Sequence, residues 1–274
     1  MARSDDPLSQ SVDPVRVSYA TGRMLGVEDF QAEQTYHRGR LARVLNVALG
    51  SGTVSGLKVQ DNRPAAPEDL ELRVTPGMAV DRAGRVIDVP YTVCIRVKRY
   101  LDQRAADKPQ DVINAFKGDA IVADVFLSFM ACDRGKTPSF ATMDDYDATD
   151  AFAPNRLLDS FAMLLVLRGD QNPRLPQDPW QALGASPTAQ DLKQHILDAD
   201  AGPAVTPLEY PSDPEFDRTS VFLARMKIPA TPPVDGAVPS YDLTANIDID
   251  NFSRLFLYPS ALVARWAGLT TGEV

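Results

Sequence analysis

The sequence is poor in the residues that most often build metal sites. It has 2 histidines and 2 cysteines in 274 residues. Because His37 and His195 lie far apart, and no His-x-x-x-His or Cys-x-x-Cys pair occurs, zinc sites of ordinary spacing are excluded. Cys94 and Cys132 each lie in an apolar, strand-like run, which favours free buried thiols and leaves a disulfide as the alternative. We expect no metal and no other cofactor.

Long apolar runs and clustered basic residues are also missing. No run approaches the roughly 20 apolar residues that span a bilayer, so we expect no membrane insertion. The polar start of the chain lacks the apolar centre of a secretory signal, which predicts synthesis in the cytoplasm without a signal peptide. The net charge of −9, with no basic stripe, argues against nucleic-acid binding.

Motifs that carry catalysis are missing as well. The chain has no phosphate-binding loop and no Gly-x-Gly-x-x-Gly after a strand. The glycines of 49–52 fit a helix end followed by a strand better than the turn of a serine hydrolase. The acidic run 143–150 is the best metal candidate, but Asp150 stands where a calcium loop needs glycine, and Arg156 where it needs glutamate. We interpret the run as a solvated loop, with a calcium site as the alternative, and predict that the chain is not an enzyme.

One long helix, with Glu28 and Asp29 in its first turn, running on to Leu49 and bracketed by glycines, is the strongest feature present. Side chains recur along it at alternating spacings of four and three residues, which keeps them in a narrow seam on one face. The seam residues are Phe30, Gln34, His37, Leu41, Val44 and Ala48. Such a seam needs a partner, so we interpret these residues as an assembly interface, not as an active site.

Alternating apolar and polar residues follow the helix. They predict a small antiparallel sheet over residues 53–99, with a hairpin turn at Gly84. We expect one side of the helix, through Phe30, Leu41 and Leu45, to cover this sheet, and the other side to face a neighbouring subunit.

The rest of the chain alternates apolar strands with proline-rich loops. Strands are predicted over 121–130, 161–167 and 220–228, a short helix follows Ser186-Pro187-Thr188, and a last helix spans 260–266. The fold class expected is α+β, mostly β: a long N-terminal helix packed on an antiparallel sheet, then a proline-rich, β-sandwich-like or mixed second part. The predicted divisions are an extended arm at 1–20, a helix-and-sheet domain at 21–100, and a second β-rich subdomain at 101–274.

Roughly residues 20 to 90 carry a specific pattern. Its turn and helix contain Gly22, Leu25, Asp29, Phe30, Glu33, Gln34 and Tyr36. It continues through Arg40, Leu45, Asn46, Gly50, Gly52, Val54, Gly56, Leu57 and Val59, and ends in a hairpin with Pro76, Gly77, Ala79, Asp81, Gly84 and Arg85. Its turns are Gly22, Gly50, Gly52, Gly56, Pro76, Gly77 and Gly84. This pattern resembles the N-terminal part of structural proteins found among the tail and baseplate components of contractile injection systems and related phage tails.

The resemblance implies a structural virion component, at the baseplate or at a fibre attachment point of a phage-tail-like particle, and it offers no catalytic residues. We expect a homo-oligomer, a trimer, that also binds other baseplate or fibre proteins. One alternative is a glycan-binding or receptor-binding module of the same machine, with an aromatic groove that involves Trp180 or Trp266. The other is a cell-wall hydrolase that uses carboxylates of Asp144 to Asp150.

Overall fold

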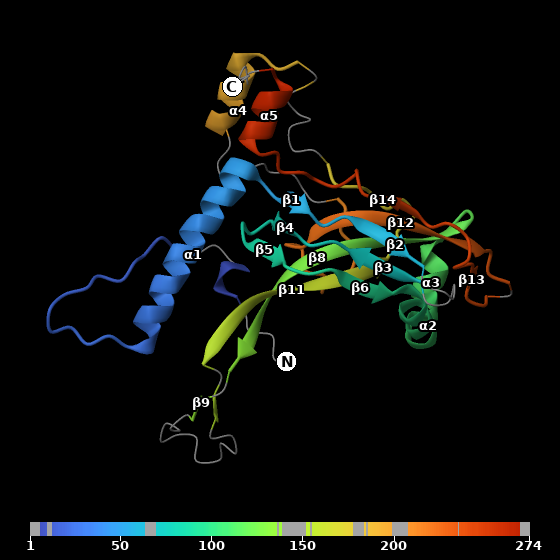
Figure 1. Cartoon of the computed structure of the whole chain (residues 1–274), viewed down its shortest axis with the longest axis horizontal. Helices are drawn as coiled ribbons and strands as arrows, with labels where there is room; N and C mark the ends of the chain where they lie inside the picture. Colours follow the sequence, from blue (N-terminus) through green and yellow to red (C-terminus); the bar gives the residue numbers. More distant parts are fainter. Residues whose placement is uncertain are drawn as a thin grey trace.

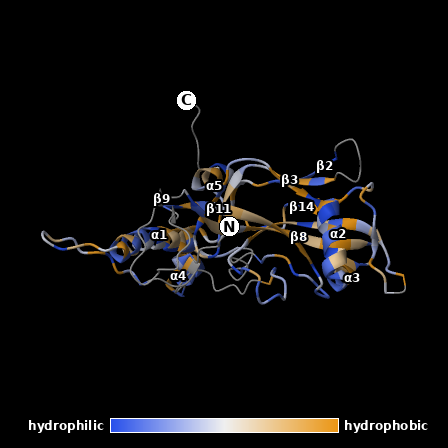
Figure 2. Ribbon diagram, turned by 90° about the horizontal axis from the view of Figure 1, so that it is seen from below, coloured by the Kyte–Doolittle hydropathy of each residue, from blue (hydrophilic) through white to orange (hydrophobic). Residues whose placement is uncertain are grey.

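The computed structural model describes residues 6–9, 13–63, 70–135, 137–138, 152–153, 155–177, 184, 186–198, 208–234 and 236–268. Helices flank several antiparallel sheets, which confirms the expected α+β class (Figure 1). The long helix α1 (Val27–Leu49) lies at one end of the molecule, and α2 (Val97–Asp107) and α3 (Pro109–Ala115) lie at the other (Figures 1 and 2).

Helix α1 begins and ends with the glycines that the sequence indicated. The Asp29 carboxylate accepts a hydrogen bond from the Gly26 N–H at 2.9 Å, which satisfies one backbone donor just ahead of the first turn. At the other end Gly50 has a φ of +80°, and its N–H donates to the Asn46 carbonyl at 2.9 Å. Local sequence therefore sets both ends of this helix.

The single sheet expected over 53–99 is in fact two three-stranded sheets. One has the order β1 (Gly52–Gly56), β4 (Gly77–Val80), β5 (Val86–Val89), and the other β2 (Val59–Asn62), β3 (Glu71–Val74), β6 (Val93–Arg96). Leu57 has a φ of +56°, so the chain turns out of the first sheet before β2 begins. At Gly56 a Cβ atom would lie 2.0 Å from the Pro76 carbonyl oxygen, so this crossing of two backbones requires glycine.

The largest sheet is built around one long strand. Its order is β11 (Arg156–Leu167), β8 (Ala120–Arg134), β12 (Val221–Thr231), β13 (Ser240–Tyr241), with β14 (Asp248–Asp250) also on β12 and β7 (Phe116–Lys117) also on β8. All of its pairings are antiparallel. The predicted strands at 121–130, 161–167 and 220–228 are therefore confirmed, and each is longer than predicted.

The remaining elements are short. They are the 3₁₀ turn η1 (Pro7–Ser9), the paired strands β9 (Thr137–Pro138) and β10 (Phe152–Ala153), and the helices α4 (Ala189–Asp198) and α5 (Ser260–Trp266). The cap predicted for α4 is confirmed, because Thr188 Oγ1 accepts a hydrogen bond from the Asp191 N–H at 3.2 Å. Helix α5 has the predicted bounds. Turn η1 lies in the arm that the sequence analysis expected to be extended.

One buried apolar cluster joins the small sheets to the large one. It includes Leu72 and Ile87 from the small sheets, and Val125 and Leu127 from β8. On the opposite face of β8, Phe126 packs in a second cluster with Tyr210 and Phe222, so this strand is buried on both faces, as its apolar run predicted. The small sheets are thus covered by the large sheet. The division of the chain into domains at residue 100 stays a prediction.

The large sheet also buries a carboxylate that holds two arginines. Asp124 on β8 is fully buried and accepts a hydrogen bond from Arg225 Nε at 2.8 Å. Arg168, just after β11, is 1% exposed and pairs with the same carboxylate. Arg168 also donates to the Glu209 carbonyl oxygen. The pairs tie β8, β12 and the end of β11 together, and each charge has a partner.

We predict that Asp124→Asn lowers the free energy of unfolding by about 3–5 kcal/mol, because it leaves two arginines without their shared anion. Urea denaturation followed by circular dichroism measures the change. Asp248→Asn is the matched control: the Asp248 carboxylate lies 3.6 Å from Lys227 Nζ at the surface, and its loss should cost less than about 0.5 kcal/mol. Equal effects of the two substitutions would contradict the structural role given to Asp124.

Candidate assembly surface

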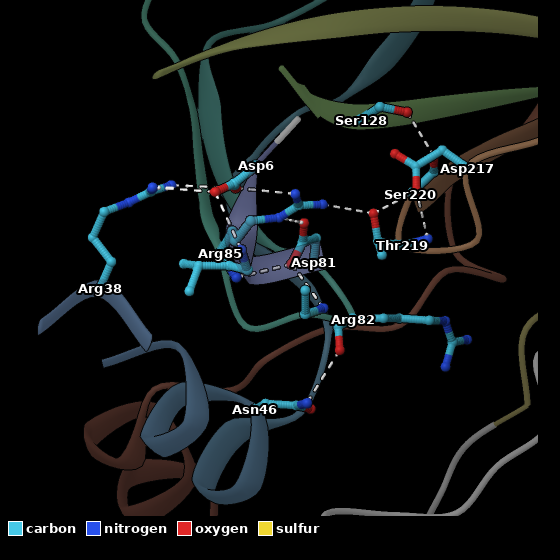
Figure 3. A network of polar contacts seen from close by, with 12 residues as sticks. Asp6, Arg38, Asn46, Asp81, Arg82, Arg85, Ser128, Asp217, Thr219 and Ser220 are labelled. Carbon is cyan, nitrogen blue, oxygen red and sulfur yellow. Dashed lines mark hydrogen bonds and ion pairs between the residues drawn. The ribbon is translucent and has the colours of Figure 1, made fainter. Parts of the chain in front are cut away.

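The turn between β4 and β5 is built by one aspartate. Asp81 Oδ1 accepts hydrogen bonds from the backbone N–H groups of Ala83 at 2.9 Å and Arg85 at 2.8 Å. Its other oxygen accepts one from Arg85 Nε at 2.6 Å (Figure 3). Burial raises the pKa of Asp81 above its ordinary value, while the Arg85 charge and the two backbone donors act to lower it. The hairpin predicted around Gly84 is therefore confirmed, with a buried ion pair at its centre.

The Arg85 side chain connects this turn to three other parts of the chain. Its guanidinium donates to Asp6 Oδ2 at 3.2 Å, next to η1, and to Thr219 Oγ1 at 2.7 Å, just before β12 (Figure 3). Its Cζ also lies 4.6 Å from the ring centroid of Phe129 on β8. A single buried guanidinium thus joins four segments that are distant in sequence.

Helix α1 is attached to this turn by its second half. Arg38 Nη1 lies 3.1 Å from Asp6 Oδ1, so Asp6 bridges the helix and Arg85. Asn46 Nδ2 donates to the Arg82 carbonyl at 3.1 Å (Figure 3). Sequence reasoning missed Asp6 and Arg38 as anchors, because their pairing joins residues far apart in the chain.

The closest approach of helix and turn is at Gly84. This residue has a φ of +81°, and a Cβ atom placed there would lie 1.9 Å from the Ala42 carbonyl oxygen. Ala42 is the buried residue of α1. A small residue on each side therefore lets the helix rest directly on the turn.

All residues of the predicted seam lie on the exposed surface of α1. They are Phe30, Gln34, His37, Leu41, Val44 and Ala48. The exposed fraction is 52% for Phe30, 57% for Leu41 and 58% for Val44, which is high for large apolar side chains. The helix therefore presents a largely apolar stripe, interrupted by Gln34 and His37, that the described part of the chain leaves uncovered.

The expectation that Phe30, Leu41 and Leu45 cover the sheet of 53–99 is wrong in detail. Phe30 and Leu41 are exposed and Leu45 is only half-buried. The helix packs on the sheet through the β4–β5 turn instead, because the apolar side of the small sheets already lies against β8 and its neighbours in one cluster.

The predicted turn residues lie at the end of α1, in the β4–β5 turn and at the far end of β1 and β4. Gly50 ends the helix, Gly52 begins β1, Gly56 and Gly77 lie at the backbone crossing with Pro76, and Gly84 lies under Ala42. Gly22 lies in a turn ahead of the helix. Gly50 and Gly84 thus position the helix directly, whereas Gly56, Pro76 and Gly77 hold β1 and β4 together at their other end.

Other candidate sites receive little support from the described residues. They contain no group of three or more His, Cys, Asp or Glu side chains able to hold a metal ion, and no helix among them is long and apolar enough to cross a bilayer. The acidic run 143–150 lies outside the described residues.

Cys94 and Cys132 are both free thiols as predicted, but Cys94 is exposed rather than buried. His37 is an exposed residue of α1 and not a core histidine.

The predicted aromatic groove receives no test at Trp180, which lies outside the described residues. Trp266 is exposed on α5. A single exposed aromatic side chain does not form a groove, so the glycan-binding alternative stays a prediction.

Comparison with solved structures finds distant likeness to a secretion-system baseplate. The chain is similar to a chain of "The baseplate complex from the type VI secretion system", with a TM-score of 0.33 and 10% sequence identity. The likeness covers 84% of this chain and 58% of that one, so this chain spans less than two thirds of its length. No family model matches the sequence, and no curated protein matches it. A likeness at this TM-score carries no argument for function.

We predict that Gly84→Ala displaces α1, because the new methyl group meets the Ala42 carbonyl in addition to straining a positive φ. The matched control is Gly118→Ala: Gly118 has a φ of +65° but nothing within 4 Å of the added atom. Strain of positive φ should cost about 1–2 kcal/mol in both variants, so the further loss in Gly84→Ala reports the helix contact. Urea denaturation measures both, and limited proteolysis within 27–49 locates the change. Equal losses and equal proteolysis would contradict the contact.

Proposed function

We propose that this chain is a non-enzymatic structural subunit of a contractile, phage-tail-like injection particle, located at the baseplate or at a fibre attachment point. It assembles through α1 with copies of itself and with other baseplate or fibre proteins. The observation that carries the proposal is the exposed apolar seam on a helix fixed to the body of the protein.

The seam argues for assembly because its exposure is costly. Burying apolar surface is worth about 25 cal/mol per Å², and contiguous exposed apolar patches usually mark interaction sites. Helix α1 has 23 residues, of which only Ala42 is buried. Since helices in proteins gain most of their stability from packing, a second surface against the seam would stabilise it.

The particle class rests on the sequence pattern of residues 20 to 90. Its residues occupy α1, the strand after it, and the turn on which the helix rests. Of the pattern residues, Asp81 and Arg85 form the β4–β5 turn on which α1 rests, and Gly84 is the point where the turn comes closest to the helix. A pattern whose residues place and expose a long helix suits an assembly protein better than an enzyme.

The number of copies is a separate matter. The sequence analysis expected a trimer from the seam alone, and that number stays a prediction until the mass of the oligomer is measured.

We predict that Leu41→Asp gives a folded protein that no longer self-associates, because the charge falls in the middle of the seam while the side chain makes no core contact. Light scattering over a wide concentration range measures the mass, and thermal unfolding monitors the fold. Leu197→Asp is the control, since Leu197 on α4 is also exposed, at 79%. An unfolded Leu41→Asp variant would place Leu41 in the core, and a wild-type monomer at all concentrations would overturn self-assembly.

The particle itself gives a second test. The full chain, tagged and expressed from its own locus, should co-sediment with particles that contain sheath and tube proteins. Leu41→Asp should reduce this co-sedimentation and Leu197→Asp should not. Absence of the wild-type chain from such particles would overturn the assignment to an injection machine.

A further inference from the structure

The charges of α1 are divided along its length. The acidic residues are Glu28, Asp29 and Glu33, and the basic ones are Arg38, Arg40 and Arg43. If the seam residues are taken as heptad positions a and d, Glu33 and Arg40 both fall at position g, directly beside the seam. Each copy of the helix therefore has an acidic end and a basic end on the same side of one apolar stripe.

Arg38 and Arg40 differ in whether they are free to pair with an anion of another chain. Arg38 is already paired with Asp6 of its own chain. Arg40 is exposed and makes no ion pair with the described residues around it. Glu33 accepts a hydrogen bond from the Tyr19 hydroxyl and lies 3.8 Å from His37 Nε2, while its side chain stays 35% exposed. Arg40 thus has no anion among the described residues, and Glu33 can accept a further donor.

We propose that a second copy of this chain covers the seam with its own α1 running antiparallel, about a two-fold axis between Gln34 and His37. The proposal rests on assembly through α1 and specifies the partner and its orientation. In this arrangement Glu33 of each copy faces Arg40 of the other, giving two symmetric ion pairs beside the seam.

The register follows from matching like side chains across the seam. With the axis between Gln34 and His37, Phe30 lies opposite Leu41 of the second copy, and Gln34 lies opposite its His37. One turn further out, Val27 lies opposite Val44. Val27 is exposed like the seam residues and continues their spacing at the start of the helix. Apolar layers therefore pair with apolar layers, and the polar layer is kept together at the centre.

Sliding the helices by one heptad step removes this match. Moving the register one way places Phe30 opposite Ala48, and Leu41 opposite His37. Moving it the other way places Phe30 opposite Gln34, and Val27 opposite His37. Each shift puts polar groups against large apolar ones, which costs free energy unless those groups find new hydrogen bonds.

A parallel pair fits the charges less well. In parallel coiled coils a g residue faces the e residue five positions later in the partner, so Arg40 would face Leu45 and gain no anion. Glu33 would face Arg38, which already pairs with Asp6. The helix dipoles would also point the same way, whereas antiparallel helices oppose them.

The attached face of α1 leaves room for this contact. At about 100° per residue, the seam is centred roughly a third of a turn around the helix from Ala42. Ala42 and Asn46 face the β4–β5 turn, and Leu41 and Val44 face outward. A two-fold contact is self-complementary and closes with two copies. The proposal therefore replaces the trimer expected from the seam alone with a dimer at this surface.

Cysteine cross-linking tests the orientation in the full chain. The background variant is Cys94→Ser, because Cys94 is exposed and Cys132 is buried. Two differently tagged variants, one with Phe30→Cys and one with Leu41→Cys, are expressed together and oxidised. A disulfide between the two variants is expected. Phe30→Cys alone should form none, because the two copies of residue 30 lie about 16 Å apart along antiparallel helices.

The other outcomes separate the orientation from the proposed function. A disulfide formed by Phe30→Cys alone would overturn the antiparallel pair and leave assembly through α1 in place. A monomeric background variant that forms no disulfide in any combination would overturn both. An oligomer without any of these disulfides would move the contact away from this seam.

Charge exchange gives an independent test. Glu33→Arg and Arg40→Glu should each weaken the dimer by at least tenfold in dissociation constant, measured by sedimentation. The double variant should restore most of the affinity, because both symmetric ion pairs are rebuilt with their charges reversed. Residues 33 and 40 are not helical neighbours, so rescue within one helix is not expected. A double variant as weak as the single ones would overturn the pairing of Glu33 with Arg40.

Discussion

The structure depends on one buried ion pair. Asp81 and Arg85 form the turn between two short strands, and the same guanidinium then reaches η1, the segment before β12, and an aromatic ring on β8. Because a buried charge must be paired, each of these segments is fixed in position by the need to satisfy it. The long helix is attached to the same group, through Asp6. Where the helix lies, and which face it leaves open, follow from this arrangement.

Features set by neighbouring residues could be predicted from the sequence. The ends of α1, the cap of α4 and the hairpin at Gly84 each depend on residues within a few positions, and each is confirmed. The buried strand β8 could also be predicted, because its run of apolar residues exceeds what a surface strand would carry.

Features that depend on contacts between residues far apart in the chain could not be predicted from the sequence. The sheet of 53–99 divides in two because Leu57 adopts a positive φ that its residue type does not suggest. Asp124 meets Arg225 through the pairing of two strands 101 positions apart, and no local pattern marks either residue. The seam and its role as an interface could be predicted from the spacing, but the exposure of Phe30 and Leu41 could not, since it depends on the large sheet taking the place expected for the helix.

Within the described part of the chain, helix α1 is attached to the body of the protein only in its second half, so its first half can tilt about that attachment. Among the described residues, Arg38 carries the polar contact nearest the N-terminus of α1 that reaches beyond the segment just before the helix, so the first turn at Val27 lies about 16 Å beyond that contact. A tilt of about 5° at Arg38 moves the first turn by about 1.4 Å, while Ala42 and Asn46 stay seated on the turn. In the proposed assembly, the free end can therefore adjust to the surface of a neighbouring subunit without disturbing the contacts of Ala42 and Asn46.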